Sequence, residues 1–295
     1  MEKMSNRLNI IGIGEVLWDV FPEGKQLGGA PCNFVYHANK LGANAFALSA
    51  VGNDDYGQEI LEMLKKKNIS TELIQVNEEP TGTVEVKLND QGVPEYIIHE
   101  NVAWDYIRLD SAVEQSFSET DIICFGSLAQ RNKISHKSIV RMLKSAGPET
   151  LIVFDINLRQ HYYNKEIIEN SLQSCHVLKL NGEELQIIST MLGLTGDSEE
   201  NRLIELMEGY NLQLLALTNG SDGSLLMTPS EKSDLPTPRV QVKDTVGAGD
   251  SFTAAMIAGF AKGEPLNEVH QKAVDLSAFV CTQDGAMPEY NEIQT

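Results

Sequence analysis

The residues most able to do chemistry lie in the stretch DTVGAGDSF, at positions 244–252. Gly247, Ala248 and Gly249 permit a tight turn with exposed N–H groups, and the apolar run that follows predicts a helix beginning there. N–H groups at a helix N-terminus bind anions such as phosphate. Asp250, at the same point, is either a helix cap, which contributes about 1 kcal/mol, or a base that accepts a hydroxyl proton while that oxygen attacks phosphorus. The stretch alone leaves both interpretations open.

The elements that must position these residues follow a βαβ rhythm. Nearly continuous apolar runs occur in DIICFGS, LIVFDIN, HVLKL and LQLLALTNG, as is typical of strands covered on both faces. Helical patterns separate most of them. Earlier in the chain, the opening LNIIGIGEVLWDV predicts one strand, and APCNFVYHANKLG predicts a helix before the next strand AFALSAVG. We expect an α/β fold with a mostly parallel central sheet and helices on both sides.

Residues 81–99 interrupt this rhythm. Apolar side chains stand at alternate positions on both sides of NDQG, which predicts an antiparallel hairpin with one face in solvent. Such an inserted element serves as a lid or a subunit contact, or is a plain edge hairpin, and the pattern does not separate these uses. Because the chain shows no repeat or linker, we expect one domain over 1–295.

Composition and charge limit the class of partner. The 295 residues can form a core without disulfides, and a net charge of −19 disfavours nucleic acid and anionic membranes but not a small anion at a local site. No window reaches the ~20 apolar residues of a membrane span, and the first residues do not form a signal peptide. We expect reduced thiols and a cytoplasmic location. The cysteines are Cys32, Cys124, Cys175 and Cys281.

Several common motifs are missing. The chain contains no GxxxxGK[ST] and no HExxH, and its six histidines are scattered without metal spacing. In GIGEVL, Leu17 stands where a dinucleotide-binding fingerprint needs its third glycine, which disfavours an oxidoreductase.

DTVGAGDSF resembles the C-terminal signature DTxGAGD of the ribokinase-like (PfkB) carbohydrate kinases. GGAPCNFVYH, at residues 28–37, is similar to the family's second signature in its fructokinase form. Further motifs follow in order along the whole chain: GEVLWD, VGNDDYG, NVAWD, GSLA, DINLR, LNGEE, TNGSDG and DGAMP. The resemblance implies the ribokinase-like three-layer α/β/α fold, with a small antiparallel β lid formed by segments near 19–30 and 81–99.

The resemblance also implies roles for matching residues in ATP-dependent phosphorylation of a sugar. Asp250 matches the catalytic base, and residues 247–249 match the anion hole for the transferred phosphoryl group. Arg159 of DINLR matches an arginine that approaches sugar or phosphate, a task that suits its planar fork. The matching sugar-binding positions are Asp19, Gly29 and Asn33, for which a turn acid and a helix cap are the alternative interpretation.

Two aromatic residues are candidate apolar walls against the carbon face of the sugar. They are Tyr96 of the predicted hairpin and Trp104 of NVAWD.

The cofactors implied are ATP and Mg²⁺, with K⁺ as a further candidate. Asn181 and Glu184 of LNGEE match a pair that acts near Mg²⁺ and phosphate largely through water, although their spacing also fits a helix capping box. The nucleotide-binding turn is matched by Thr218, Gly220 and Gly223, with a plain β-turn as the alternative. The monovalent-cation site is matched in part by Asp244 and Gly285.

The sequence thus predicts a sugar kinase whose partners are ATP and a small sugar. D-Fructose phosphorylated at its C6 hydroxyl is the leading substrate, and a homodimer through the lid is expected. The alternatives are a kinase for 2-keto-3-deoxygluconate, ribose or a nucleoside, and a non-catalytic sugar-binding protein on the same fold. The intact Asp250 and glycine turn favour an enzyme.

Overall fold

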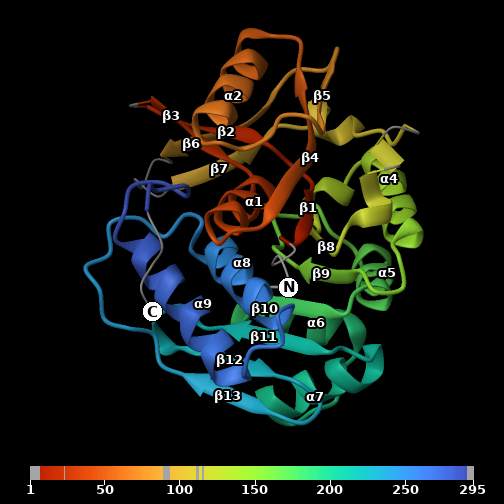
Figure 1. Cartoon of the computed structure of the whole chain (residues 1–295), viewed down its shortest axis with the longest axis vertical. Coiled ribbons are helices and arrows are strands. Elements are labelled where there is room, and N and C mark those ends of the chain that lie inside the picture. Colours follow the sequence, from red (N-terminus) through yellow and green to blue (C-terminus); the bar gives the residue numbers. More distant parts are fainter. Residues whose placement is uncertain (1–6, 23, 89–93, 111–112, 115, 291–295) are drawn as a thin grey trace, which may run out of the picture.

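A nine-stranded sheet is the frame of the molecule (Figure 1). The structure is a computed structural model that describes residues 7–22, 24–88, 94–110, 113–114 and 116–290, without the side chains of 86–88, 94–96, 116 and 118. The strands are β1 (Asn9–Ile13), β4 (Asn44–Gly52), β5 (Ile74–Asn77), β8 (Ile122–Phe125), β9 (Leu151–Asp155), β10 (Val177–Asn181), β11 (Leu214–Thr218), β12 (Ser224–Met227) and β13 (Lys232–Leu235). Their order is β13-β12-β11-β10-β9-β8-β1-β4-β5, and only the pairings β11–β12 and β12–β13 are antiparallel. The predicted mostly parallel sheet is confirmed.

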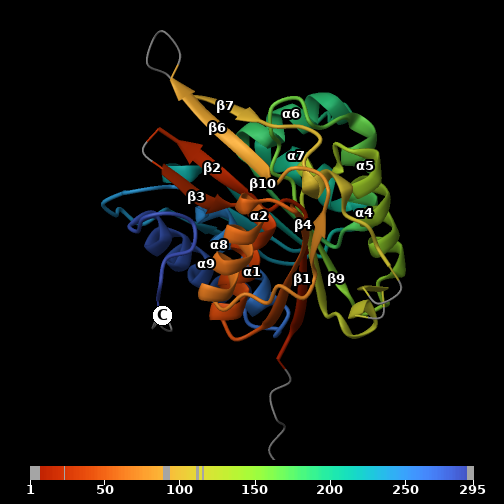
Figure 2. The same ribbon diagram turned by 90° about the horizontal axis from the view of Figure 1, so that it is seen from above.

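Helices cover both faces of this sheet, which makes three layers (Figure 2). One face carries α1 (Ala30–Lys40), α2 (Asp55–Lys66), α8 (Ala248–Phe260) and α9 (Leu266–Cys281). The other carries α4 (Lys133–Ser145), α5 (Lys165–Ser174), α6 (Gly182–Leu192) and α7 (Glu199–Tyr210). Alternate strand residues enter opposite hydrophobic cores: in β11, Leu215 and Leu217 join one core, and Leu214 and Ala216 the other. This alternation explains why the strands are apolar on both faces.

A second, four-stranded sheet projects from one end of the molecule (Figure 2). It contains β2 (Leu17–Phe21), β3 (Gly24–Gly28), β6 (Gly82–Leu88) and β7 (Pro94–Ile98), in the order β3-β2-β6-β7. The antiparallel hairpin predicted within 81–99 is present as β6 and β7, β2 and β3 form a second one that was not predicted, and a parallel pairing of β2 with β6 joins them. The turn NDQG lies outside the described residues. The segments 19–30 and 81–99 therefore meet in one small sheet, although α1, β4, α2 and β5 lie between them in the sequence.

The prediction of one opening strand was wrong, because the chain leaves the large sheet after Ile13. Gly14 has φ 153°, and a Cβ there would lie 2.7 Å from Pro31 Cγ. This glycine turn directs the following residues into β2 of the small sheet.

The cysteines bear out the expectation of free thiols. Cys32, Cys124 and Cys175 are buried, and Cys281 is half-buried. No helix within the described ranges has the length and apolar character needed to cross a membrane.

Candidate active site

Polar residues gather where the parallel strands of the large sheet end. Asp155 ends β9, Asn181 ends β10 and Thr218 ends β11, while Glu15 and Ser127 follow β1 and β8 closely. Carboxyl ends of parallel strands lie at one edge of a sheet, which is where open α/β sheets bind their ligands. The helix α8 begins at the same edge, because Thr253 in its second turn hydrogen-bonds Asp155 of β9 and Gly249 in its first turn lies next to Lys179 of β10.

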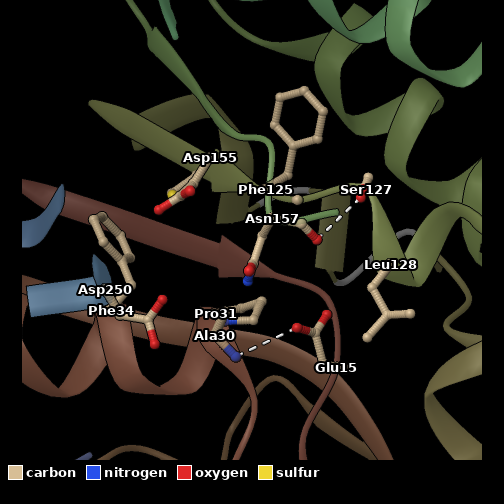
Figure 3. A pocket seen from close by; sticks show the side chains of 12 residues that line it. Glu15, Ala30, Pro31, Phe34, Phe125, Ser127, Leu128, Asp155, Asn157 and Asp250 are labelled. Atoms are coloured by element: carbon tan, nitrogen blue, oxygen red, sulfur yellow. Dashed lines mark hydrogen bonds between the residues drawn. The ribbon is translucent and has the colours of Figure 1, made fainter. Parts of the chain in front are cut away.

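A pocket opens at this edge (Figure 3). Three carboxylates lie around it, those of Glu15, Asp155 and Asp250. Its other polar lining comes from Ser127 and Asn157, and its apolar lining includes Phe34, Phe125 and Leu128. A small molecule with both hydroxyl groups and a carbon face suits such a lining.

The turn before α8 has the geometry of an anion site. Gly247 is the N-cap with φ 77°, and a Cβ there would lie 2.7 Å from Ala286 Cα, so only glycine fits. The first N–H groups of a helix have no partner within it, and here Ala248 N alone makes a long 3.3 Å bond back to Thr245 O. The predicted helix start is confirmed, and the positive end of α8 points its N–H groups at the site.

Asp250 lies in the first turn of α8 but does not cap it. The cap is Gly247, and no side chain makes a capping hydrogen bond there, so the cap interpretation of Asp250 was wrong. Asn33 Nδ2 donates a 2.7 Å hydrogen bond to Asp250 Oδ2. Burial, and then the neighbouring Asp155 carboxylate, raise the pKa of Asp250 to about 7. A carboxylate with such a pKa can accept and return a proton near neutral pH.

Asn33 has one polar atom left over. Its Oδ1 is buried and finds no hydrogen-bond partner among the described residues, while the residue as a whole is 4% exposed. Buried acceptors without partners are costly, so this atom fits a ligand donor. At the start of the same helix, Gly29 has φ 113° and lies against the Glu15 carbonyl with no room for a side chain.

Asp19 lies on β2 and Arg159 in the loop after β9, and the charge of Arg159 acts on Asp19. Burial raises the pKa of Asp19, on β2, to about 6, while Arg159 opposes that rise and Asp244 adds to it. Arg159 follows β9, is exposed, and also lowers the pKa of Glu15 and Asp250. The predicted arginine therefore lies within electrostatic reach of both the predicted sugar carboxylate and the predicted base.

Asn181 and Glu184 form a complete capping box at the start of α6. Glu184 N donates to Asn181 Oδ1 at 2.9 Å, and Asn181 N donates to Glu184 Oε2 at 2.8 Å. Glu184 Oε1 accepts a further bond from Leu158 N at 2.9 Å, which places this carboxylate beside the DINLR loop. The capping interpretation is confirmed.

Direct protein ligands for a metal ion are sparse. In the part of the chain that the structure describes, no three His, Cys, Asp or Glu side chains gather closely enough to hold one. Both Glu184 oxygens already accept a backbone N–H but keep lone pairs for water. This donor set fits Mg²⁺, which keeps most of its water and is held by few carboxylates together with phosphate.

The turn after β11 and the segment around Asp244 complete the edge. Gly220 and Gly223 have φ 56° and 125°, and a Cβ on Gly223 would lie 2.6 Å from Leu235 O. This glycine turn follows Thr218 directly. Asp244 Oδ2 accepts a 3.2 Å bond from Gly285 N, so the two residues expected at a cation site are in contact.

Trp104 is not brought into the pocket. It is fully buried in the core on the 3₁₀ helix Ala103–Tyr106, against Gly82, and the Arg131 guanidinium stacks on its ring at 4.0 Å. The side chain of Tyr96 lies outside the described residues.

Sequence reasoning missed three further charged residues: Glu15 and Asp155, which line the pocket, and Lys179, which pairs with Asp155. Lys179 in β10 pairs with Asp155 in β9 at 3.0 Å, and Glu15 accepts a bond from Ala30 N. The available signal was a lysine and an aspartate inside otherwise apolar strand runs, because such residues are almost never buried without a partner.

The fold and the site together define a class: an α/β protein that presents a helix N-terminus and a near-neutral carboxylate to one pocket, as phosphoryl-transfer enzymes do. Residues 13–293 match the model of the pfkB family carbohydrate kinases, and the chain belongs to that family. It is a sugar kinase of this family.

Known relatives span almost the whole chain. The putative sugar kinase PH1459 of Pyrococcus horikoshii is 29% identical over 93% of this chain and 90% of its own length. The probable fructokinase-5 of Arabidopsis thaliana is 26% identical over 97% of this chain and 95% of its own length. A fructokinase of Xylella fastidiosa, solved with bound ATP, shares the fold with a TM-score of 0.83 at 22% identity, covering 95% of this chain and 94% of the other.

Proposed function

We propose that this chain transfers a phosphoryl group from ATP to the C6 hydroxyl of D-fructose. The observation that carries the proposal is the Asn33–Asp250 pair at the start of α8. It joins a carboxylate whose pKa is near 7 to an amide whose oxygen is buried without a partner. A sugar that offers a hydroxyl donor to Asn33 would bring another hydroxyl towards Asp250.

In this proposal each residue has a distinct task. Asp19 accepts hydrogen bonds from sugar hydroxyls, and Asn33 both donates to Asp250 and accepts from the sugar. Asp250 removes the proton of the attacking hydroxyl. The N–H groups of residues 247–249 stabilise charge that develops on the phosphoryl oxygens, a contribution worth about 10²–10³ in rate for one comparable donor. Arg159 adds a planar, permanently charged donor on the open side.

ATP supplies the phosphoryl group when bound, and the turn from Thr218 to Gly223 would hold the nucleotide. The support is that PH1459, 27% identical to this chain, has been solved in complex with ATP, with a TM-score of 0.80. Asn181 and Glu184 would hold Mg²⁺ through water. Asp244 and Gly285 would contribute to a K⁺ site beside the glycine turn.

The choice of fructose rests on the relatives. Besides the plant protein, the fructokinase of Salmonella typhimurium is 26% identical over 93% of this chain. The runner-up is a kinase for 2-keto-3-deoxygluconate, ribose or a nucleoside. In the same proposal the small sheet closes over the sugar as a lid and mediates a homodimer, and the single kinase domain works in the cytoplasm, which its free thiols favour.

A substrate panel tests the proposal. Purified protein with Mg-ATP should form ADP fastest, by kcat/KM, with D-fructose when compared with ribose, glucose, 2-keto-3-deoxygluconate, adenosine and inosine. Asp19→Ala should raise the KM for the sugar far more than the KM for ATP. Preference for a nucleoside or a keto acid would replace fructose but keep the kinase. No ADP with any compound would favour a sugar-binding protein.

A further inference from the structure

A buried ion pair joins Asp155 of the pocket lining to Lys179, and none of the proposed steps uses it. Lys179 and Asp155 are each 8% exposed, and Lys179 Nζ lies 3.0 Å from Asp155 Oδ1. Burying two charges costs several kcal/mol for each ion before their attraction is counted, so such a pair is poor support for stability alone. Its position next to α8 suggests a role in holding and tuning Asp250.

Both partners reach the first two turns of α8. Thr253 Oγ1 donates a 2.8 Å hydrogen bond to Asp155 Oδ2 and also lies 3.0 Å from Gly249 O. Lys179 Nζ lies 3.0 Å from the point where a Cβ of Gly249 would stand. Asp155 is therefore hydrogen-bonded to α8 through Thr253, and the Lys179 ammonium lies next to the turn that carries Asp250.

We propose that Lys179 and Asp155 are positioning residues for Asp250: Asp155 anchors the N-terminal part of α8 through Thr253, Lys179 lies next to the turn that carries Asp250, and their charges act on Asp250 in opposite senses. The catalytic role in this inference rests on the proposed function, whereas the effect of the two charges on the pKa of Asp250 does not.

The electrostatics around Asp250 agree with that geometry. The charged or titratable groups that face it are Asp155 of β9, Arg159 of the loop after β9, Lys179 of β10, Glu15 of the loop after β1, and Cys124 of β8. Asp155 raises the pKa of Asp250, whereas Lys179 and Arg159 lower it. Of these groups, the structure ties only Asp155 and Lys179 to each other by an ion pair.

Two single variants should shift the pKa of Asp250 in opposite directions. In Lys179→Met the acidic limb of kcat/KM, measured with Mg-ATP and D-fructose between about pH 5 and pH 9, should move to higher pH by about one unit. In Asp155→Asn it should move to lower pH by a similar amount. The same shifts should appear in the ¹³C NMR titration of the Asp250 carboxyl in aspartate-labelled full-length protein, assigned with Asp250→Asn. That second readout needs no turnover.

Further variants separate charge from tether and from folding. Thr253→Val keeps both charges but removes the hydrogen bond to Asp155, so it should lower kcat while the acidic limb of kcat/KM stays at the same pH. Lys179→Met combined with Asp155→Leu removes both charges together and should return the limb close to wild type, even where Asp155→Asn alone does not fold. The matched control is Lys232→Met on β13, which breaks the exposed pair with Glu200 of α7 and should change nothing.

The outcomes distinguish the two proposals. Wild-type protein without kinase activity overturns the proposed function, and the NMR titration still decides the inference. Shifts in the same direction, or a lower melting temperature with an unmoved Asp250 titration in both single variants, would show that the pair is structural only.

Discussion

Asp250 shows how one side chain acquires its chemistry from its surroundings. On an exposed helix it would titrate like any aspartate, with a pKa near 4. Here burial, together with Asp155, raises its pKa to about 7, while Asn33 holds one of its oxygens in place. Desolvation and a like charge each raise a carboxyl pKa, and both are present here.

Asp250→Asn should lower kcat by about 10²–10⁴, the usual contribution of a positioned base. The amide keeps the shape of the side chain, so the affinities for sugar and ATP, measured by calorimetry, should stay within a few-fold of wild type. An Asp250→Asn enzyme with nearly normal kcat would place the base elsewhere.

The same carboxyl should affect stability with a defined sign. Because its folded-state pKa lies above that of the unfolded chain, the folded state holds a proton that the unfolded state has lost between about pH 4 and pH 7. The free energy of unfolding therefore decreases as pH rises through this window. The melting temperature of Asp250→Asn should rise relative to wild type from pH 5 to pH 8, whereas Asp284→Asn, in an exposed pair with Lys243, should run parallel to wild type.

Arg159 is exposed, yet its charge acts on several carboxylates of the site. Arg159→Lys keeps the charge and loses the planar fork, so kcat/KM should fall about tenfold or more if phosphate is held by two parallel hydrogen bonds. The control is Arg202→Lys on α7, where the guanidinium donates to Gln186 Oε1 and to Ser198 O, away from the pocket. Unchanged kinetics in Arg159→Lys would leave Arg159 as a surface residue.

At the scale of elements, α1 links the pocket to the C-terminal segment. Asn33 and His37 are four residues apart and therefore share one face of the helix. Asn33 holds Asp250, while His37 Nε2 lies 2.9 Å from Ala286 O and Nδ1 lies 2.8 Å from Tyr290 Oη. Ala286 is the residue against which Gly247 packs. One helix therefore supports both the base and the backbone behind the anion site.

His37 should make this support sensitive to acid. Burial lowers its pKa to about 4, so the folded state stays neutral while the unfolded chain takes up a proton below about pH 6.5. The free energy of unfolding should therefore fall as pH drops from 6.5 towards 4. His37→Gln should flatten this slope in melting-temperature measurements, and exposed His161→Gln should not. Equal slopes in wild type and His37→Gln would contradict the prediction.

At the scale of the whole molecule, the site opposes the global charge. The chain carries a net charge of −19, and three carboxylates surround the pocket, so a polyphosphate approaches against repulsion. The start of α8, Arg159 and buried Lys179 supply the local positive potential. A divalent cation bound to the phosphates would reduce their repulsion from these carboxylates.

Removal of metal should therefore abolish activity. With excess EDTA, ADP formation should fall to background and return on adding Mg²⁺, while the melting temperature without nucleotide stays unchanged, because no group of three potential ligands lies within the described residues. Full activity in EDTA would remove Mg²⁺ from the proposal, and a lower melting temperature would indicate a structural ion instead.

The sequence by itself determined features that depend on neighbouring residues. The helix start after Gly247, the capping box of Asn181 and Glu184, the hairpin within 81–99 and the parallel sheet follow from turn chemistry and side-chain periodicity. The tertiary structure alone decided the rest. It joined Asn33 to Asp250 across 217 positions and Thr253 to Asp155 across 98. It also split the first strand and buried Trp104 in the core. Local periodicity sets which face of an element is apolar, but only closure of the sheet and its helices sets which distant polar side chains meet at its edge.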